Sequence, residues 1–418
     1  MNAFEIFTPG KTPVVTLVDD HLIKKKAAFL DALAQGGILI SISGPSKSGK
    51  TVFVKNIVGA ENLVPISGAG VSSSDELWLR VFHMIGTPIE ESEVAEQGTT
   101  VTISGAAKAA GSAIFAKAEA SLGASGAMLS KQGSSKKASI DRLQLLIKEL
   151  AGTDFVIFID DFHYIPYETQ IEVSRQIKEA IDKGVKIACA SVPYHSEDVL
   201  RANSDLRGRI VNIDFEYWPE NSLRQIPQKG FRALNGWVPD STLDSLVAEV
   251  AGSPQLMQSL CLSASLESGV RETTSAPWTL QSDSDFYGEV CLRTAVGANY
   301  SSTLEKLEEG PKTRGTDRNQ YRLTDGSVGD VYSILLKAIA LDPPTLHFRY
   351  SNLTDRIKKI CETVNPSGSS VTGACLQIAQ LANDGQARAI IDWDAAEDVL
   401  DIRDPYLLFY IRWNKPRT

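Results

Sequence analysis

Residues 38–59 read ILISISGPSKSGKTVFVKNIVG, and this stretch decides the fold. The β-branched apolar run at 38–42 predicts a buried strand, and the apolar segment after Thr51 is compatible with a helix. Between them, residues 44–51 match the pattern G-x-x-x-x-G-K-[ST] at every fixed position. In this strand–loop–helix setting, the pattern predicts a phosphate-binding loop and not an ordinary glycine–serine turn.

The loop is expected to bind phosphate through both backbone and side chains. Its glycines let the backbone N–H groups face phosphate oxygens, and the following helix N-terminus adds positive partial charge. Lys50 is predicted to reach the β- and γ-phosphates, and the Thr51 hydroxyl to bind Mg²⁺. ATP and Mg²⁺ are therefore the predicted cofactors. The predicted nucleotide-binding residues of the loop are Gly44, Pro45, Ser46, Lys47, Ser48, Gly49, Lys50 and Thr51.

A second apolar run supplies carboxylates. Residues 155–159 (FVIFI) predict a central parallel strand, and Asp160 and Asp161 follow it directly. A carboxylate at the C-terminal end of such a strand lies where open α/β sheets bind ligands. Asp160 is predicted to bind Mg²⁺, and Asp161 to orient or deprotonate the attacking water. Two aspartates at a strand end can also cap a helix, but the complete P-loop pattern upstream favours the catalytic interpretation.

The first half of the chain alternates strands with helices. Further strands are predicted at 63–67, 185–192 and 210–215, which makes a five-stranded parallel sheet of the α/β class spanning residues 1–218. A stretch rich in alanine, glycine and serine, about 88–139, interrupts this core. It is predicted to be a surface insertion. Close packing of its small residues onto a partner is the alternative.

The strand signal ends near residue 219. Residues 219–270 predict a small helical lid, and residues 271–327 are polar and turn-rich, as expected for a connector. From 328 to 418, three helices followed by a strand pair predict a winged-helix-like α+β domain. The predicted fold is thus a P-loop NTPase core, a lid and this terminal domain.

Composition narrows the setting. The net charge is −9, which opposes a whole-surface attraction to nucleic acid or anionic membrane. The chain has five widely spaced cysteines and no CxxC pair, a pattern that is typical of reduced thiols. The sequence starts without a basic-then-apolar signal region and contains no uninterrupted apolar run of 18 residues. A cytoplasmic protein without membrane contact is expected.

The P-loop, the IFIDDFH strand end, the lid and the terminal domain together resemble the AAA+/STAND ATPases, near their archaeal-type and origin-recognition-like branches. The resemblance covers roughly residues 15–265, and more loosely 328–413. Gly252-Ser253-Pro254 in the lid is similar to the GxP motif of STAND proteins, which implies that Gly252 and Pro254 bind nucleotide. A plain helix start is the alternative. Many fast AAA+ motors carry Asp-Glu where this chain has Asp160-Asp161. Because aspartate is one methylene shorter than glutamate, Asp161 fits slow, switch-like hydrolysis.

The same resemblance implies residues that sense or act on the γ-phosphate. Ring-forming relatives place an arginine just before the fifth strand and supply it to the neighbouring subunit. Arg209 is the first candidate and Arg207 the second, with a surface salt bridge as the alternative. In these relatives a polar residue at the end of the fourth strand usually senses the γ-phosphate. Ser191 occupies that position here, although asparagine is the common residue there.

The terminal domain carries little sign of DNA binding. Residues 311–418 hold fourteen Lys/Arg against thirteen Asp/Glu, and the segment 371–384, where a recognition helix is expected, has neither Lys nor Arg. A protein-contact role is therefore favoured, while Arg356, Lys358 and Lys359 keep DNA binding open.

Three functions follow. The first is an ATP-driven switch that forms a homo-oligomer and regulates a partner protein, as in bacterial conflict and defence systems. The second is a DNA-binding AAA+ loader or regulator. The third is a structural subunit that binds ATP and hardly hydrolyses it. ATP-dependent assembly without DNA favours the first, and DNA-stimulated hydrolysis with a steep salt dependence favours the second.

Overall fold

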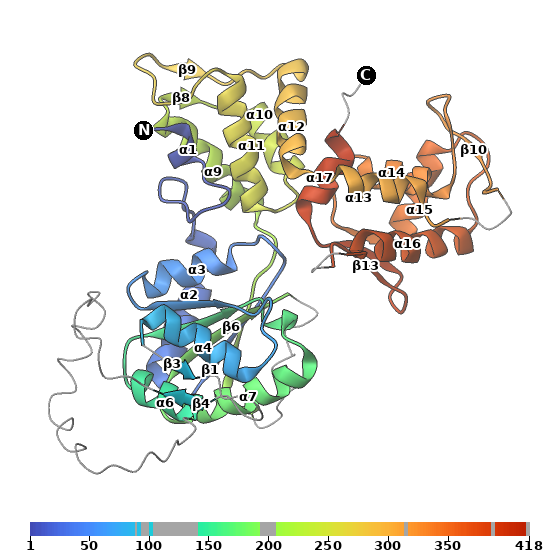
Figure 1. Cartoon of the computed structure of the whole chain (residues 1–418). Helices are drawn as coiled ribbons and strands as arrows, with labels where there is room; N and C mark the ends of the chain where they lie inside the picture. Colours follow the sequence, from blue (N-terminus) through green and yellow to red (C-terminus); the bar gives the residue numbers. More distant parts are fainter. Residues whose placement is uncertain are drawn as a thin grey trace, which may run out of the picture. The chain divides into compact units, whose positions relative to one another are not determined.

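The computed structural model describes residues 1–87, 90–92, 100–102, 141–192, 206–312, 317–385 and 389–414. It divides into two compact units (Figure 1). The sheet unit comprises Leu22–Gly44 and Lys50–Phe215, and the helical unit comprises Met1–His21, Pro45–Gly49 and Glu216–Thr418. The insertion expected at about 88–139 lies outside the described residues, apart from a short antiparallel pair, β3 (Glu90–Ser92) and β4 (Thr100–Thr102).

The sheet unit is built on five parallel strands, as predicted. Their order is β2 (Leu63–Ser67), β5 (Val156–Asp160), β6 (Lys186–Ser191), β1 (Leu39–Ser43) and β7 (Ile210–Asp214). Every residue of β1 is buried, because helices cover both faces of the sheet. A parallel sheet buried in this way needs strands that are apolar along their whole length, which is the pattern read from the sequence.

Alternate residues of the central strands feed two apolar clusters, because successive side chains of a strand point to opposite faces. One cluster holds Ile40 and Ile42 with side chains from α2 (Ile23–Gln35) and α3 (Lys50–Val58). The other holds Leu39 with side chains from α4 (Ser74–Ile85), α6 (Arg142–Leu150) and α7 (Tyr167–Asp182). The sheet unit is therefore a three-layer α/β structure.

The predicted lid forms three helices of the helical unit. They are α9 (Glu220–Ala233), α10 (Asp240–Glu249) and α11 (Pro254–Glu267). The short N-terminal helix α1 (Ala3–Ile6) contributes Ala3 and Ile6 to the same apolar cluster. A parallel pair, β8 (Gly236–Trp237) and β9 (Trp278–Thr279), flanks these helices.

The structure differs from the expectation of a connector at 271–327. Two helices lie there, α12 (Ser284–Ala298) and α13 (Ser301–Glu309). Phe286, Val290 and Cys291 of α12 are buried in the lid cluster. The apolar stripe of α12 is narrow and includes small residues between polar ones. Its helical pattern is therefore hard to recognise in a segment whose composition is mostly polar. Tertiary packing decides its structure.

The C-terminal part has the winged-helix-like order of elements. In sequence these are α14 (Val331–Ala340), β12 (His347–Arg349), α15 (Tyr350–Ile360), α16 (Gly368–Asn383), β13 (Ile391–Asp394) and β14 (Val399–Ile402). The predicted three helices and hairpin are present, and β12 adds a third antiparallel strand in the order β12-β14-β13. A small hairpin of β10 (Tyr321–Arg322) and β11 (Val328–Gly329) precedes α14.

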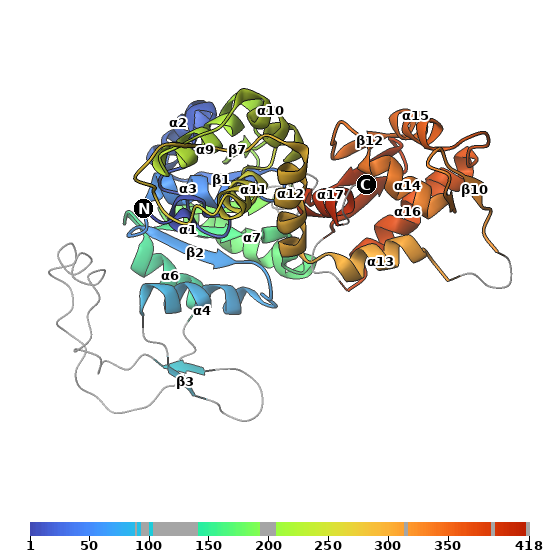
Figure 2. The ribbon, with the colours of Figure 1, turned by 90° about the horizontal axis from the view of Figure 1, so that it is seen from above.

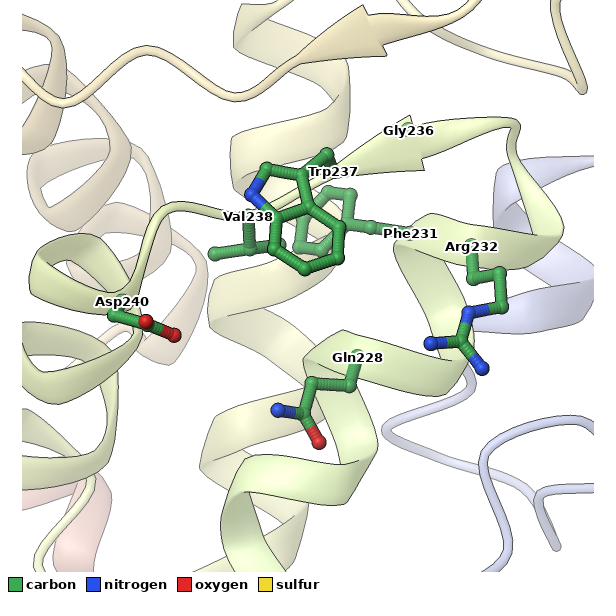
Figure 3. Close-up of a pocket in the computed structure, with 7 residues that line it drawn as sticks. All are labelled: Gln228, Phe231, Arg232, Gly236, Trp237, Val238 and Asp240. Carbon is green, nitrogen blue, oxygen red and sulfur yellow. The ribbon is translucent and has the colours of Figure 1, made fainter.

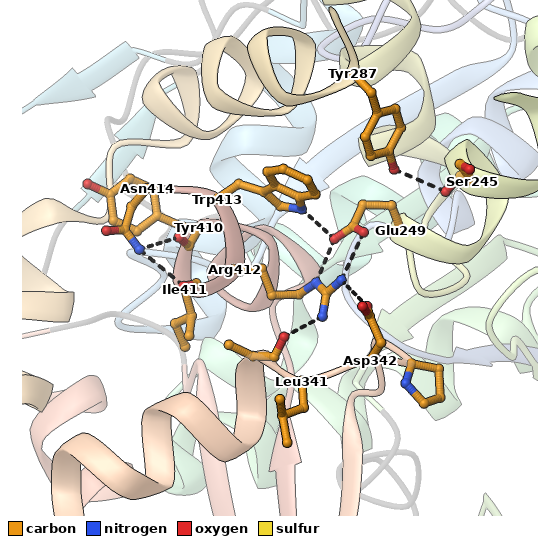
Figure 4. A network of polar contacts seen from close by, with 12 residues as sticks. Ser245, Glu249, Tyr287, Leu341, Asp342, Tyr410, Ile411, Arg412, Trp413 and Asn414 are labelled. Carbon is orange, nitrogen blue, oxygen red and sulfur yellow. Dashed lines mark hydrogen bonds and ion pairs between the residues drawn. The ribbon is translucent and has the colours of Figure 1, made fainter. Parts of the chain in front are cut away.

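A last helix, α17 (Pro405–Trp413), joins this C-terminal part to the lid (Figure 2). Phe409 and Trp413 pack into the apolar cluster of the lid. Arg412, whose side chain is 1% exposed, pairs with Glu249 of α10 at 2.6 Å (Figure 4). The Trp413 indole N–H donates to Glu249 at 2.7 Å, and Arg412 also donates to Asp342 at 2.6 Å. The buried charges are thus paired and hydrogen-bonded, as burial requires.

Candidate nucleotide-binding site

The carboxyl edge of the sheet brings together four polar residues. Ser43 ends β1 and lies opposite Ser191 at the end of β6 and opposite Asp214 at the end of β7. Asp160 ends β5, which pairs with β6. Because the P-loop follows Ser43 directly, this edge is where an open parallel sheet binds its ligand.

Thr51 and Asp160 form the predicted metal-binding pair. Thr51 lies in the first turn of α3, and its hydroxyl donates to the Asp160 carboxylate at 2.5 Å. Mg²⁺ is usually held by one or two protein oxygens together with phosphate oxygens and waters. Among the residues that the structure describes, no group of three or more His, Cys, Asp or Glu side chains could hold a metal ion. The donor set therefore fits a magnesium ion that a nucleotide brings with it.

The P-loop backbone has the curled conformation that phosphate binding requires. Lys47 and Gly49 have positive φ values of 62° and 95°. A Cβ on Gly44 would lie 2.4 Å from the Phe215 Cβ, so only glycine fits where the strand enters the loop. Such turns direct successive N–H groups to one side and form an anion-binding nest. The conformation supports the predicted binding of nucleotide phosphates.

Two side chains of the loop also suit a phosphate ligand. The Lys50 ammonium donates to the Gly44 carbonyl at 2.8 Å, which keeps it over the loop. Ser48 is 2% exposed, and its buried hydroxyl has no hydrogen-bond partner among the described residues. Buried hydroxyls normally have a partner, so an acceptor from outside the chain is expected. An ATP phosphate fits these donors.

Asp161 is held in place by its backbone. It has a positive φ of 59° and immediately precedes the short 3₁₀ turn η2 (Phe162–Tyr164). Gly68 lies against it, since a Cβ on Gly68 would be 2.6 Å from the Asp161 carbonyl oxygen. The Gly68 N–H donates to the Asp160 carbonyl at 2.7 Å. Gly68 was not predicted from the sequence, and its position after the strand 63–67 is the only local signal.

Asp214 is a second residue that the sequence analysis missed. Its carboxylate accepts a hydrogen bond from the Ser43 hydroxyl at 2.5 Å. It closes the apolar-rich strand 210–214 as Asp160 closes β5. The same strand-end reasoning could therefore have found it. Ser191, the predicted sensor, is buried at the end of β6, on the other side of β1 from β7.

Arg209 lies at the opposite edge of the sheet. It precedes Ile210, which is opposite Leu39 at the start of β1, and its carbonyl accepts from the Leu39 N–H at 2.8 Å. A five-residue strand spans about 17 Å, so Arg209 and the P-loop are separated by that length. The Arg209 side chain pairs with Asp182 at the end of α7, and Arg207 is exposed. Neither arginine is brought to the P-loop of its own chain.

The tip of the P-loop belongs to the helical unit, where Trp218 contacts it. The Trp218 indole N–H donates to the Ser48 carbonyl at 2.8 Å, and its backbone N–H donates to the Gly252 carbonyl at 3.0 Å. Gly252 has a positive φ of 85°, and Pro254 opens α11. Gly252 is thus linked to the P-loop tip by hydrogen bonds through Trp218, and Pro254 follows it two residues later.

Lys47 makes the other contact of the loop tip. Its ammonium donates to both carboxylate oxygens of Asp404, at 2.8 and 2.7 Å, and lies 4.2 Å from the centre of the Tyr406 ring. Neither Trp218 nor Asp404 was predicted, because no local pattern marks a residue that contacts the P-loop from 170 or 357 positions away.

A small pocket on the lid is separate from these residues (Figure 3). Its volume is about 130 Å³, below the roughly 300 Å³ at which drug-sized ligand pockets begin. It is therefore too small for a nucleotide. It is lined by Gln228, Phe231, Arg232, Gly236, Trp237, Val238 and Asp240.

Comparison with known proteins identifies the fold. No protein-family model and no curated protein matches the sequence. A Walker-type ATPase of Pyrococcus abyssi matches the structure with a TM-score of 0.50 and 15% identity, covering 94% of this chain and 95% of that one. Cdc6p of Pyrobaculum aerophilum matches with a TM-score of 0.42 and 11% identity, covering 99% of each chain. The ORC2 protein of Aeropyrum pernix matches with a TM-score of 0.43 and 12% identity, covering 94% of this chain and 92% of that one.

The chain therefore has the fold of a Walker-type P-loop ATPase, as the sequence predicts. This likeness concerns the fold alone, since identity is low. None of the helices in the described part of the chain has the length and apolar character needed to cross a membrane.

Proposed function

We propose that this protein binds ATP with Mg²⁺ at residues 44–51 and hydrolyses it slowly. The observation that carries the proposal is the 2.5 Å contact between Thr51 and Asp160 beside a P-loop already curled into a nest. Mg²⁺ bound there would neutralise charge on the phosphates. Lys50 and the loop N–H groups hold the phosphates, and Asp161 orients the attacking water or accepts its proton.

We further propose that the active form is a homo-oligomer. Arg209 is separated from its own P-loop by the length of β1, so it can act on a γ-phosphate only from a neighbouring chain. We assign to Ser191, at the end of β6, the role of sensing that phosphate. Slow hydrolysis with a shared site favours a switch that is assembled in one nucleotide state.

A protein partner is favoured over DNA as the target of this switch. Arg356, which kept DNA binding open, donates to the carbonyls of Ala338, Leu341 and Pro343. Lys358 pairs with Asp355. These contacts support a structural use of the basic residues on α15, and α16 has no Lys or Arg. Regulation of a partner in a bacterial conflict or defence system is the setting that we infer from the resemblance.

Two substitutions test the site. Lys50→Ala should abolish ATP binding, because the ammonium that compensates the phosphate charge is lost. Asp161→Asn should retain binding and lower hydrolysis by roughly 10²-fold, the lower range for loss of a general base. Calorimetric titration with ATP and a phosphate-release assay measure the two effects.

Lys55→Ala is the matched control, since Lys55 is exposed on the same helix as Lys50. It should behave as the parent protein does. ATP binding by Lys50→Ala at the parent's affinity would refute the site.

A further inference from the structure

Lys47 has a backbone conformation that its side chain disfavours. Its φ of 62° lies in the left-handed region, where a residue with a Cβ is strained and glycine is not. Lys47 occupies a variable position of the P-loop pattern, so glycine would be compatible with the motif. This conformation is nevertheless what turns the loop N–H groups toward one side.

Asp404 holds the Lys47 side chain. Both carboxylate oxygens of Asp404 accept from the ammonium, and only 13% of the Asp404 side chain and 24% of the Lys47 side chain are exposed. The Tyr406 ring covers the ammonium at 4.2 Å. A charge pair of this kind is screened less than a surface pair.

Asp404 is itself rigidly placed. It caps the N-terminus of α17 by accepting from the Tyr406 N–H at 2.9 Å, and it accepts from the Tyr300 hydroxyl at 2.6 Å. Tyr406 is hydrogen-bonded in turn to Ser259 of α11 at 2.6 Å. The anchor of Lys47 is therefore built from the lid, from Tyr300 before α13 and from the last helix of the chain, all within the helical unit.

We propose that Asp404 is a positioning residue for phosphate binding, which holds Lys47 in its left-handed conformation and thereby keeps the P-loop nest formed. The proposal rests on the proposed binding of ATP at this loop. The Lys47 ammonium is engaged by Asp404 and contributes through its backbone, whereas Lys50 is the lysine that meets the phosphates. Linkage is reciprocal, so bound nucleotide should stabilise the contact between Lys47 and Asp404 by the same factor.

A pair of substitutions at Lys47 separates backbone positioning from direct charge contact. Lys47→Met and Lys47→Gly both remove the ammonium, but only glycine adopts the positive φ without strain. We expect Lys47→Gly to bind ATP about five- to tenfold more tightly than Lys47→Met, since one left-handed residue with a Cβ is worth about that factor. Equal losses in the two variants would show that the ammonium contacts phosphate directly and would overturn the proposal.

A double-variant cycle tests Asp404. Asp404→Asn retains a side-chain oxygen to cap α17 but loses the charge, and it should weaken ATP binding by about five- to tenfold in the parent chain. The same exchange should have no effect in the Lys47→Gly background, where the loop needs no anchor. A purely structural role for Asp404 would weaken binding equally in both backgrounds, and that result would refute the proposal.

Asp392→Asn is the control for this cycle, because Asp392 pairs with Arg403 on the same part of the chain at 2.6 Å. Its ATP affinity should equal that of the parent. Absence of ATP binding by the parent would instead contradict the proposed function itself. If Asp404→Asn does not fold, as judged by circular dichroism, Asp404→Ser, which also keeps an oxygen to cap α17 and loses the charge, takes its place in the same cycle.

Discussion

At the scale of single residues, glycines decide where the residues of the proposed site lie. Gly44 lets the strand enter the P-loop beside Phe215, and Gly68 lets the backbone of Asp161 approach closely. The first glycine belongs to the P-loop pattern. The role of Gly68 is recognised only in the structure, where the carboxyl end of β2 lies beside the carboxyl end of β5.

Gly68→Ala tests the positioning of Asp161. The new Cβ would lie 2.6 Å from the Asp161 carbonyl oxygen, so the turn that carries the carboxylate must move. We expect hydrolysis to fall by about 10- to 10²-fold with ATP affinity nearly unchanged, since displacements of about 1 Å cost that much. Gly288→Ala, where a Cβ meets no atom within 4 Å, is the control. A parallel loss of affinity and turnover in Gly68→Ala would contradict the assigned role.

At the scale of elements, the contact between α10 and α17 combines an apolar interface with a buried charge pair. Glu249 is 6% exposed and accepts from both Arg412 and Trp413. Burial raises the pKa of the nearby Tyr287 hydroxyl above its usual range. Such an interior tolerates a paired charge and strongly disfavours a lone one.

Glu249→Ala should therefore destabilise the protein by about 3–5 kcal/mol, because it leaves the Arg412 guanidinium buried without this carboxylate. The double variant Glu249→Leu/Arg412→Leu should be considerably more stable than Glu249→Ala. Urea unfolding followed by tryptophan fluorescence measures both. Asp355→Ala, which breaks the exposed pair with Lys358, should leave the midpoint unchanged. A similar midpoint for Glu249→Ala and the parent would show that the pair is not buried in solution.

At the scale of the whole molecule, the two halves of the proposed catalytic machinery lie at opposite edges of one sheet. The P-loop, Asp160 and Ser191 lie at the carboxyl edge, and Arg209 lies at the amino edge. A single chain cannot bring them together, because the strands between them are rigid. Composite sites in an oligomer are the arrangement that uses both.

Mixing two inactive variants tests composite sites. Arg209→Ala should keep the ATP affinity of the parent and lose turnover, by less than the 10³–10⁵ typical of fast enzymes if hydrolysis is slow. Mixed with Lys50→Ala, it should recover part of the activity, since some interfaces then pair an intact P-loop with an intact arginine. Arg175→Ala, on the exposed face of α7, serves as the control.

Native mass spectrometry completes this test. We expect a larger assembly with ATP than without it, and no further change on adding duplex DNA. A monomer in ATP, together with no recovery in the mixture, would leave Arg209 as a surface partner of Asp182. Assembly that requires DNA would move the loader function to first place.

The sequence by itself determined the elements whose signals are local. The P-loop pattern, the apolar strands and Asp160 are readable because each depends on neighbours a few residues away, and β-strand burial on both faces leaves a continuous apolar run. The closeness of Thr51 and Asp160 then follows from the parallel α/β arrangement, whereas the strand order β2-β5-β6-β1-β7 was given by the structure alone. Helix α12 was hidden because its apolar stripe is narrow.

Only the tertiary structure decided the contacts that join distant segments. Lys47 meets Asp404 across 357 positions, Ser48 meets Trp218 across 170, and Glu249 meets Arg412 across 163. Each partner is an ordinary charged or aromatic residue in its own neighbourhood, and no spacing rule links it to the other. Such pairs exist because the folded chain places them within hydrogen-bond distance at buried or partly buried sites, where an unpaired charge or donor is unfavourable.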